Sequence, residues 1–414
     1  LNDNEVATTT NRIVNLLPST TVTESDGLTV TLTLTELQRI RTLEISNTPG
    51  GDGIDAVLLE TKYGAFQDVA VNPSLHVTSI VVIETADTTA PSGVQAWLDL
   101  NNGTLRIFFD ETIDLTPAST QINPSAILLV DEDGGEANLP LTGAHVVELD
   151  RVVVTLVLTE LQRVKAIERS GTPGGDSTPL HLRLGYQATR DIGQNYNQQS
   201  WQSGGDLLVQ ETADTTPPVL EAALLNLSDG RMLFTFSETI DSTPSADKVN
   251  TNDVVFRNAD NGLEILRLTG SFVISDDQLT LTLTMDEEKR VLSIENSGEP
   301  GGDTTPMVLH TTSLFVHDIA GVGMVPIDAS TGGFVINEIA DTIRPNVVGG
   351  EINYDTGVMI LEHTETVDST PFSNVVLDKY SFLAQDGATP SVQLAGADTT
   401  EHDSYNFTIT LTER

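Results

Sequence analysis

The chain has 414 residues, no cysteine and a formal charge of −40, from 60 acidic against 20 basic side chains. Its length predicts two to four domains. Its negative charge repels phosphates and anionic lipids, which excludes nucleic acids and anionic membranes as partners. The lack of cysteine excludes disulfides, thiolate metal sites and cysteine nucleophiles. No apolar run approaches the length that crosses a bilayer, so we expect no membrane insertion in this segment.

The first 86 residues predict strands and one short helix. Leu28–Leu34 alternates apolar residues with threonine, which is typical of a strand with one buried face. Thr35 and Gln38 then match a capping box. The apolar residues after this cap recur at helical spacing, at Leu37, Ile40 and Leu43. No signal peptide is visible, and the opening strands of the later repeats are missing, so we expect a piece of a longer array.

The next elements begin with the acidic linker Asp87–Pro91, which its proline stiffens. Asn102-Gly103 follows, between apolar strands, and predicts a tight hairpin turn. A second capping box, at Thr159 and Gln162, predicts another short helix. The order of strands, turns and one capped helix therefore repeats along the chain.

The repeat has a constant step. The linker aspartates are Asp87, Asp214 and Asp341, and both 214 − 87 and 341 − 214 give 127. The segments that begin at Glu111, Glu238 and Glu365 keep the same step. We therefore expect four modules: a partial module 1 (1–86), complete modules 2 (87–213) and 3 (214–340), and a partial module 4 (341–414). Many short strands punctuated by turns predict an all-β fold of tandem immunoglobulin-like (Ig-like) sandwiches, each with one short helix.

Three recurring segments carry a family resemblance. They are the linker Asp214–Pro218, the strand end Phe236–Asp241 and the late turn Asp318–Gly321. Together they resemble the bacterial-type Ig-like repeats of giant cell-surface and adhesin proteins, which also occur in cyanobacterial, algal and protist surface arrays. The resemblance implies a cell-surface location, tandem extension and, in several branches, calcium at the domain junctions.

Recurring aspartates are the candidate ligands of calcium, since carboxylate oxygens suit this hard cation. The candidates lie in the linkers, at adjoining domain ends and in the late turn: Asp87, Asp214 and Asp341; Asp114, Asp241 and Asp368; Asp191 and Asp318. The alternative is that each caps a turn through bonds from backbone amides. The glutamates Glu111, Glu238 and Glu365 also recur, but a glutamate at a strand end is expected to be solvated.

Three N-glycosylation sequons begin at Asn102, Asn226 and Asn406. Asn102 lies in the predicted hairpin turn, where it is accessible. Glycans at these positions are expected only if the source is eukaryotic. The sequence therefore allows a glycoprotein without establishing one.

We expect a structural rod or filament segment outside the cell, with stiff, calcium-bound linkers. No metalloprotease, serine hydrolase or phosphate-loop motif occurs, and we expect no enzyme. The expected partners are other copies of the chain or neighbouring repeats in a filament or surface layer. One alternative is an adhesin that binds a protein or a glycan, the latter through Tyr196 and Trp201. Another is a spacer in a larger secreted enzyme.

Overall fold

The computed structural model describes residues 13–16, 20–22, 25–131, 137–200, 205–274, 277–328, 330, 332–383, 392–399 and 402–412. The chain divides into two compact units, Leu1–Thr216 with Ile319–Gly321, and Pro217–Asp318 with Val322–Arg414. Unit 1 contains modules 1 and 2 and the start of the next linker. Unit 2 contains most of module 3 and all of module 4. The strands carry 38% of the residues and the helices 13%, which confirms the predicted all-β, Ig-like fold.

Module 2 is a sandwich of two sheets that share one strand. Its elements are β5 (Gly93–Asp99), β6 (Thr104–Ile113), α2 (Ala118–Gln121), β7 (Ile127–Asp131), β8 (Leu139–Pro140), β9 (His145–Val146), β10 (Arg151–Val157), α3 (Glu160–Glu168), β11 (Leu180–Leu184) and β12 (Leu207–Thr212). The strand order is β8-β7-β11-β12-β5-β6-β10-β9. The start of β12 pairs antiparallel with β11, and its later part pairs parallel with β5, so β12 passes from one sheet to the other.

Module 3 repeats this plan in unit 2. Its elements are β13 (Leu220–Asn226), β14 (Arg231–Asp241), α5 (Ser245–Lys248), β15 (Val254–Asn258), β16 (Glu264–Arg267), β17 (Phe272–Ile274), β18 (Gln278–Thr284), α6 (Glu287–Glu295), β19 (Met307–Thr311), β20 (His317–Asp318), β21 (Phe334–Val335) and β22 (Asn337–Ile339). One sheet has the order β17-β18-β14-β13-β22 and the other β16-β15-β19-β21. The core between them contains Phe234 and Phe315, whose rings meet edge to face with centroids 5.3 Å apart. The hairpin turn predicted at Asn102-Gly103 is present and recurs at Asp229-Gly230, where Gly103 and Gly230 adopt φ values of 68° and 67°.

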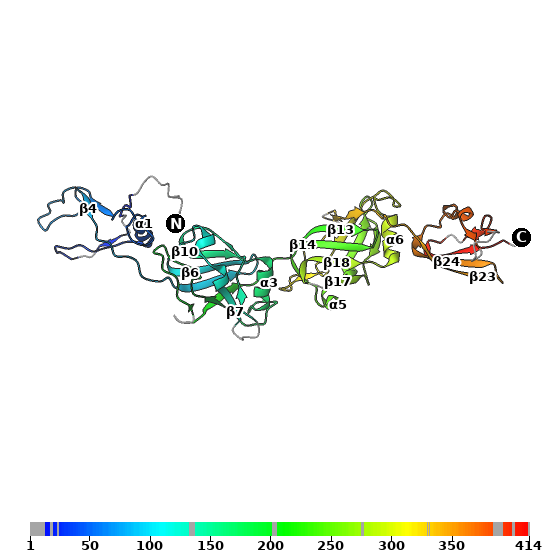
Figure 1. The fold of residues 1–414 in the computed structure, drawn as a ribbon, viewed down its shortest axis with the longest axis horizontal. Helices are drawn as coiled ribbons and strands as arrows, with labels where there is room; N and C mark the ends of the chain where they lie inside the picture. Colours follow the sequence, from blue (N-terminus) through cyan, green and yellow to red (C-terminus); the bar gives the residue numbers. More distant parts are fainter. Residues whose placement is uncertain are drawn as a thin grey trace. The chain divides into compact units, whose positions relative to one another are not determined.

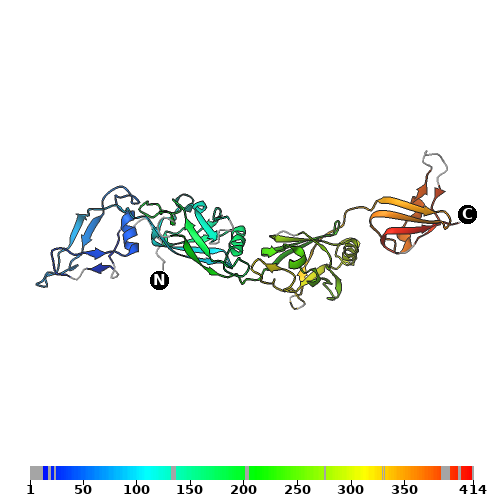
Figure 2. The same cartoon turned by 90° about the horizontal axis from the view of Figure 1, so that it is seen from below.

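The capped helices of modules 2 and 3 each lie at one end of their sandwich. Figures 1 and 2 show this for α3 and α6 from two directions. The predicted capping boxes form at Thr35 and Thr159, each with its glutamine three residues later. The prediction of a single helix per module is incomplete, because α2 and α5 add a one-turn helix to modules 2 and 3. The capped helices matter for function, since they lie next to the linkers described below.

Modules 1 and 4 contain part of this plan. Module 1 has β1 (Thr21–Val22), β2 (Leu32–Thr33), α1 (Glu36–Glu44), β3 (Leu58–Thr61) and β4 (Val77–Val81). Module 4 has β23 (Val347–Asn353), β24 (Val358–Val367), β25 (Ser381–Phe382), β26 (Val392–Gln393), β27 (Asp398–Thr399) and β28 (Ser404–Thr410). The strand predicted over Leu28–Leu34 is reduced to β2. In module 2 the corresponding strand β10 pairs with β6 and buries Val154 completely, whereas its counterpart Val30 is 59% exposed.

Candidate functional site at the module junctions

The site begins with one arginine on the capped helix of module 1. Thr35 accepts a hydrogen bond from the backbone of Gln38 and thereby fixes the start of α1. Glu36 and Arg39 then lie one turn apart on the same face. The guanidinium of Arg39 donates to both carboxylate oxygens of Glu36, over 2.7 and 2.9 Å. Glu36 thus orients Arg39 toward the end of its module.

Arg39 also binds the linker and the neighbouring module. Its Nη1 donates to Oδ2 of Asp87 over 2.6 Å, and its Nη2 donates to Oε2 of Glu111 over 3.1 Å. Glu111 belongs to β6, and the backbone N–H of the next residue, Thr112, donates to Glu36 over 2.9 Å. Helix α1, the linker and β6 are therefore joined through one guanidinium. We call this set of contacts the arginine latch.

The latch recurs in unit 2 with the same residue types. Arg290 of α6 donates to Glu287, to Asp341 in the linker over 2.7 Å and to Glu365 of β24 over 3.3 Å. The backbone N–H of Thr366 donates to Glu287 over 2.9 Å. Arg290 also donates to the backbone carbonyl of Leu227 in its own module. The arginine latch is therefore a recurring feature of the repeat, since the same residue types make the same contacts at both junctions.

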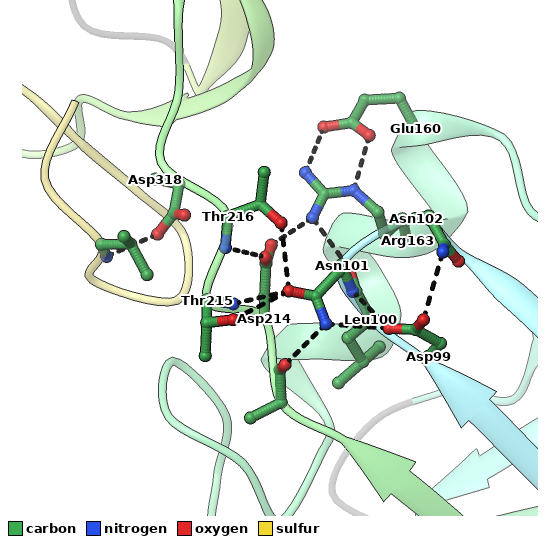
Figure 3. A network of polar contacts seen from close by, with 12 residues as sticks. Asp99, Leu100, Asn101, Asn102, Glu160, Arg163, Asp214, Thr215, Thr216 and Asp318 are labelled. Carbon is green, nitrogen blue, oxygen red and sulfur yellow. Dashed lines mark hydrogen bonds and ion pairs between the residues drawn. The ribbon is translucent and has the colours of Figure 1, made fainter. Parts of the chain in front are cut away.

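Within unit 1, Arg163 of α3 makes the corresponding contacts with the linker that follows module 2. Figure 3 shows its guanidinium bound to Glu160, to Asp214 and to the backbone carbonyl of Leu100. The side chains of Arg163 and Asp214 are only 6% and 1% exposed. Asn101 fixes the linker itself, because its side-chain oxygen accepts from the backbone of Thr215 and from two threonine hydroxyls. The linker is thus hydrogen-bonded to the end of module 2.

Three carboxylates meet beside Arg39. One oxygen each of Asp87, Glu111 and Asp191 lies within 4.8 Å of the others. Asp191 is held there by an antiparallel bridge to Ile113, at the end of β6. Asn195 donates to both oxygens of Asp191 and to the backbone oxygen of Asp87. We call Asp87, Glu111 and Asp191 the junction carboxylates.

The pKa of Glu111 lies well above its usual range. Burial raises its pKa to about 7, the negative charges of Asp191 and Asp87 act in the same direction, and Arg39 opposes them. Burial also raises the pKa of Asp191, while bonds from Asn195 lower it. The junction therefore favours a proton or another positive charge on Glu111 near neutral pH.

This acidity predicts a pH dependence of stability. The pKa of Glu111 is about 7 in the fold against 4.5 for a free glutamate, so the folded chain binds the proton more tightly. In the absence of divalent cations, lowering the pH from above 7 toward 4.5 should raise the stability of unit 1. The measurement is the melting temperature of the wild type and of Glu111→Gln across this range. Other acids titrate in the same range, so the quantity to compare is the difference in melting temperature between the wild type and Glu111→Gln at each pH. A difference that does not change with pH would contradict the prediction.

A glycine turn packs against the junction from module 1. An added Cβ on Gly50, whose φ is 90°, would lie 1.9 Å from the backbone oxygen of Ile192 in module 2. On the other side, an added Cβ on Gly193 would lie 2.8 Å from Cβ of Asp87. Real side chains do not approach so closely, so both positions require glycine. The turn Pro49–Asp52 has the sequence Pro-Gly-Gly-Asp, which recurs at Pro173–Asp176 and Pro300–Asp303. In module 1 this turn therefore has a docking role.

The other predicted calcium ligands lie apart from the junction carboxylates. Asp114 pairs with Arg190 over 3.1 Å, and Asp241 pairs with Lys248 over 2.6 Å. Asp368 accepts from the backbone of Thr370, as a turn aspartate does. Asp318 accepts from the backbone of Val322 over 2.8 Å.

The candidate glycosylation sites differ in exposure. Asn102 and Asn406 are exposed, the first in the hairpin turn and the second on β28. Asn226 is half-buried, and the hydroxyl of its sequon residue, Ser228, accepts from the backbone of Thr342. Trp201 lies outside the described residues. Its expected companion Tyr196 is exposed and contacts Tyr186, with ring centroids 6.4 Å apart.

Sequence reasoning missed the latch and misjudged its glutamates. Glu111, Glu238 and Glu365 were expected to be solvated, but all three are at least nine-tenths buried. Arg39, Arg163 and Arg290 drew no attention, although they recur with steps of 124 and 127 (163 − 39 and 290 − 163). The available signal was a glutamate three residues before an arginine in every capped helix.

Comparison with known proteins finds similarity to solved structures alone, and at a low level. No protein-family model matches the chain, and no curated protein matches it. Solved structures that match include a titin tandem of three domains, at 7% identity and a TM-score of 0.17, which covers 78% of this chain and 89% of its own. Extracellular domains 3–5 of Drosophila OTK match at 12% identity and a TM-score of 0.18, covering 79% and 87% of the two chains. Likeness at this level carries no argument about what the chain binds.

No helix in the described part of the chain is long and apolar enough to cross a membrane.

Proposed function

We propose that the chain is a segment of an extracellular structural rod, in which arginine latches limit bending between successive Ig-like modules. The observation that carries this proposal is the recurrence of one latch, around Arg39 in unit 1 and around Arg290 in unit 2. A flexible tether would need no such contacts, since hydrophilic linkers move freely without them. The expected partners are further copies or neighbouring repeats in a filament or surface layer.

The latch is suited to this role because each guanidinium engages three segments at once. Bending at the first junction would separate Arg39 from Asp87 or Glu111, and Glu36 from the backbone of Thr112. Buried charges that lose their partner are costly, so the bent state is disfavoured. Each module has its own core, and the latches hold successive modules in a fixed relative position, so that a stable array of modules can be long and stiff.

The adhesin alternative has one supporting observation. Tyr186 and Tyr196 form an exposed aromatic pair on module 2, and such rings can stack on a sugar. A spacer role in a larger secreted enzyme is compatible with the same latches. The structural rod remains the proposal because the latch recurs between modules, whereas the aromatic pair belongs to one module.

The rod proposal is tested by the distance between modules 1 and 2. The chain has no cysteine, so Lys62→Cys and Ser119→Cys, at exposed positions in the two modules, place two spin labels without further changes. We expect a narrow distance distribution, and a clearly broader one when Arg39→Ala is added. Arg106→Ala, at an exposed position of β6, is the matched control. An equally broad distribution in the unaltered chain and in Arg39→Ala would contradict the proposal.

A further inference from the structure

Module 1 exposes strands that have more neighbours in module 2. In the described part of module 1, β3 and β4 form a sheet of two strands, in which Leu59 pairs with Ile80. At the same place in module 2, Leu182 of β11 pairs with Leu207 of β12, but these strands lie inside an eight-stranded sheet. Leu59 is 38% exposed, whereas Leu182 is completely buried. Module 1 therefore presents an apolar surface and open strand edges, which are typical of an interaction site.

Module 4 has the complementary open edge. Its strand β23 corresponds to β5 and lies at the edge of a sheet of order β23-β24-β28-β27. In module 2, β5 pairs in parallel with the later part of β12, where Val209–Thr212 faces Ala96–Asp99. The repeat places Gly350–Asn353 of β23 two steps of 127 after Ala96–Asp99, and Val82–Thr85 of module 1 one step before Val209–Thr212. Each module therefore holds the strand that completes the edge of the other.

The capped helix gives a second, independent match. Arg163 and Arg290 each donate to a backbone carbonyl in the first hairpin of their own module, at Leu100 and Leu227. Both leucines are completely buried. The corresponding residue of module 4 is Tyr354, which is 86% exposed. Arg39 of module 1 is only half-buried, so the carbonyl of Tyr354 suits it as the carbonyls of the two leucines suit the other arginines.

One segment is present in both modules. Leu28–Leu34 of module 1 corresponds to β28 of module 4, and β28 pairs with β24 as β10 pairs with β6. Leu28, Val30 and Leu32 are exposed in module 1. This segment therefore loses little packing when β28 of another copy takes its place.

We propose that module 4 of one copy of the chain and module 1 of a second copy join into one complete Ig-like module. In this composite module, Val82–Thr85 of one copy adds to the free edge of β23 of the other, and α1 covers Tyr354. Main-chain hydrogen bonds along a strand edge give affinity, and the side chains on either side give specificity. The partner is a second copy because the chain's own repeat supplies both the edge and the register. The proposal rests on the proposed rod function and extends the rod beyond one chain.

The test is the association of the full chain, measured by sedimentation velocity over a range of concentrations. Copies with a charge of −40 repel each other, so the buffer contains about 0.15 M salt, which screens charges beyond about 8 Å. We expect the wild type to associate and Tyr354→Glu to associate at least ~10-fold more weakly, because the composite module buries this position and an unpaired buried carboxylate is costly. Tyr63→Glu is the matched control, since Tyr63 is exposed and its counterpart Tyr186 stays exposed in module 2. A wild type that remains monomeric, or equal association of the two variants, would overturn the proposal.

Disulfide formation tests the register. In module 2, Gln210 pairs with Trp97, and the corresponding residues of the composite module are Ile83 and Glu351, both exposed in the single chain. A chain with Ile83→Cys and Glu351→Cys should form a ladder of covalent multimers on mild oxidation, because paired strands hold Cα atoms within the about 4.4–6.8 Å that a disulfide spans. Ser119→Cys with Glu351→Cys is the control, since Ser119 lies on module 2. Equal ladders from both pairs, or none from either, contradict the proposed pairing.

The result is separable from the test of the rod function. Association concerns two copies, whereas the spin-label distance between modules 1 and 2 concerns one. A narrow distance distribution in a chain that stays monomeric supports the rod and rejects the composite module. Association with equally broad distributions in the unaltered chain and in Arg39→Ala supports the composite module and rejects the latch as the source of stiffness.

Discussion

Replacing Arg163 with alanine is expected to lower the free energy of unfolding of unit 1 by about 3–5 kcal/mol. The change leaves the carboxylate of Asp214 without its cation at a position where only 1% of the side chain is exposed. It also removes the donor to the backbone oxygen of Leu100. A buried charge that loses its partner destabilises far more than the intact pair stabilises. Urea unfolding, followed by the transition that reports unit 1, measures the change.

The control for this variant is an arginine in an exposed pair. Arg231 lies 3.7 Å from Asp229, and its side chain is 64% exposed. Such surface pairs contribute about 0–1 kcal/mol, so Arg231→Ala should have little effect. Arg163→Lys should fall between the two, because lysine keeps the charge but cannot bind Glu160, Asp214 and Leu100 together. Similar losses for Arg163→Ala and Arg231→Ala would show that the latch arginine is not a special site.

The period, the strands and the capped helices could be predicted because their signals are local. A capping box needs only Thr159 and Gln162, and a hairpin turn needs only Asn102 and Gly103. The buried face of the helix could not be predicted in the same way. Leu37 continues the apolar spacing but is 58% exposed, while Gln38 is buried. The helix lies at the end of its sandwich, so its face toward the junction is polar.

The site itself depends on pairs that are distant in sequence. Arg39 and Asp87 are 48 residues apart, and Arg39 and Glu111 are 72 apart. An arginine in a short helix is usually solvated, and so is a glutamate at a strand end. The glutamate was therefore predicted to be solvated, and the arginine was not predicted to belong to a site. Only the packing of one module's helix against the next module's strand end brings the charges together and buries them. Of the latch residues, only the linker aspartate Asp87 was predicted from the sequence as a site residue.

Gly50→Ala should separate modules 1 and 2 without unfolding either one. The added Cβ would lie 1.9 Å from the backbone oxygen of Ile192, and backbone cannot yield as a flexible side chain does. Overpacking costs about 1–3 kcal/mol, so the docked state loses about that much relative to the undocked state. The side chain at positive φ costs module 1 a further ~1–2 kcal/mol whether or not it is docked. The spin-label distance between Lys62→Cys and Ser119→Cys should broaden, as it should in Arg39→Ala.

Gly64→Ala is the control that introduces the backbone strain of a positive φ without a clash between the modules. Gly64 also has a positive φ, of 75°, but an added Cβ there meets nothing within 4 Å. It should therefore cost about 1–2 kcal/mol within module 1 and leave the distance distribution narrow. If Gly50→Ala and Gly64→Ala both keep it narrow, the glycine turn does not dock on Ile192. If Gly50→Ala alone broadens it, the Pro-Gly-Gly turn and the arginine latch restrain the same junction from two sides, which explains why a module end keeps both features.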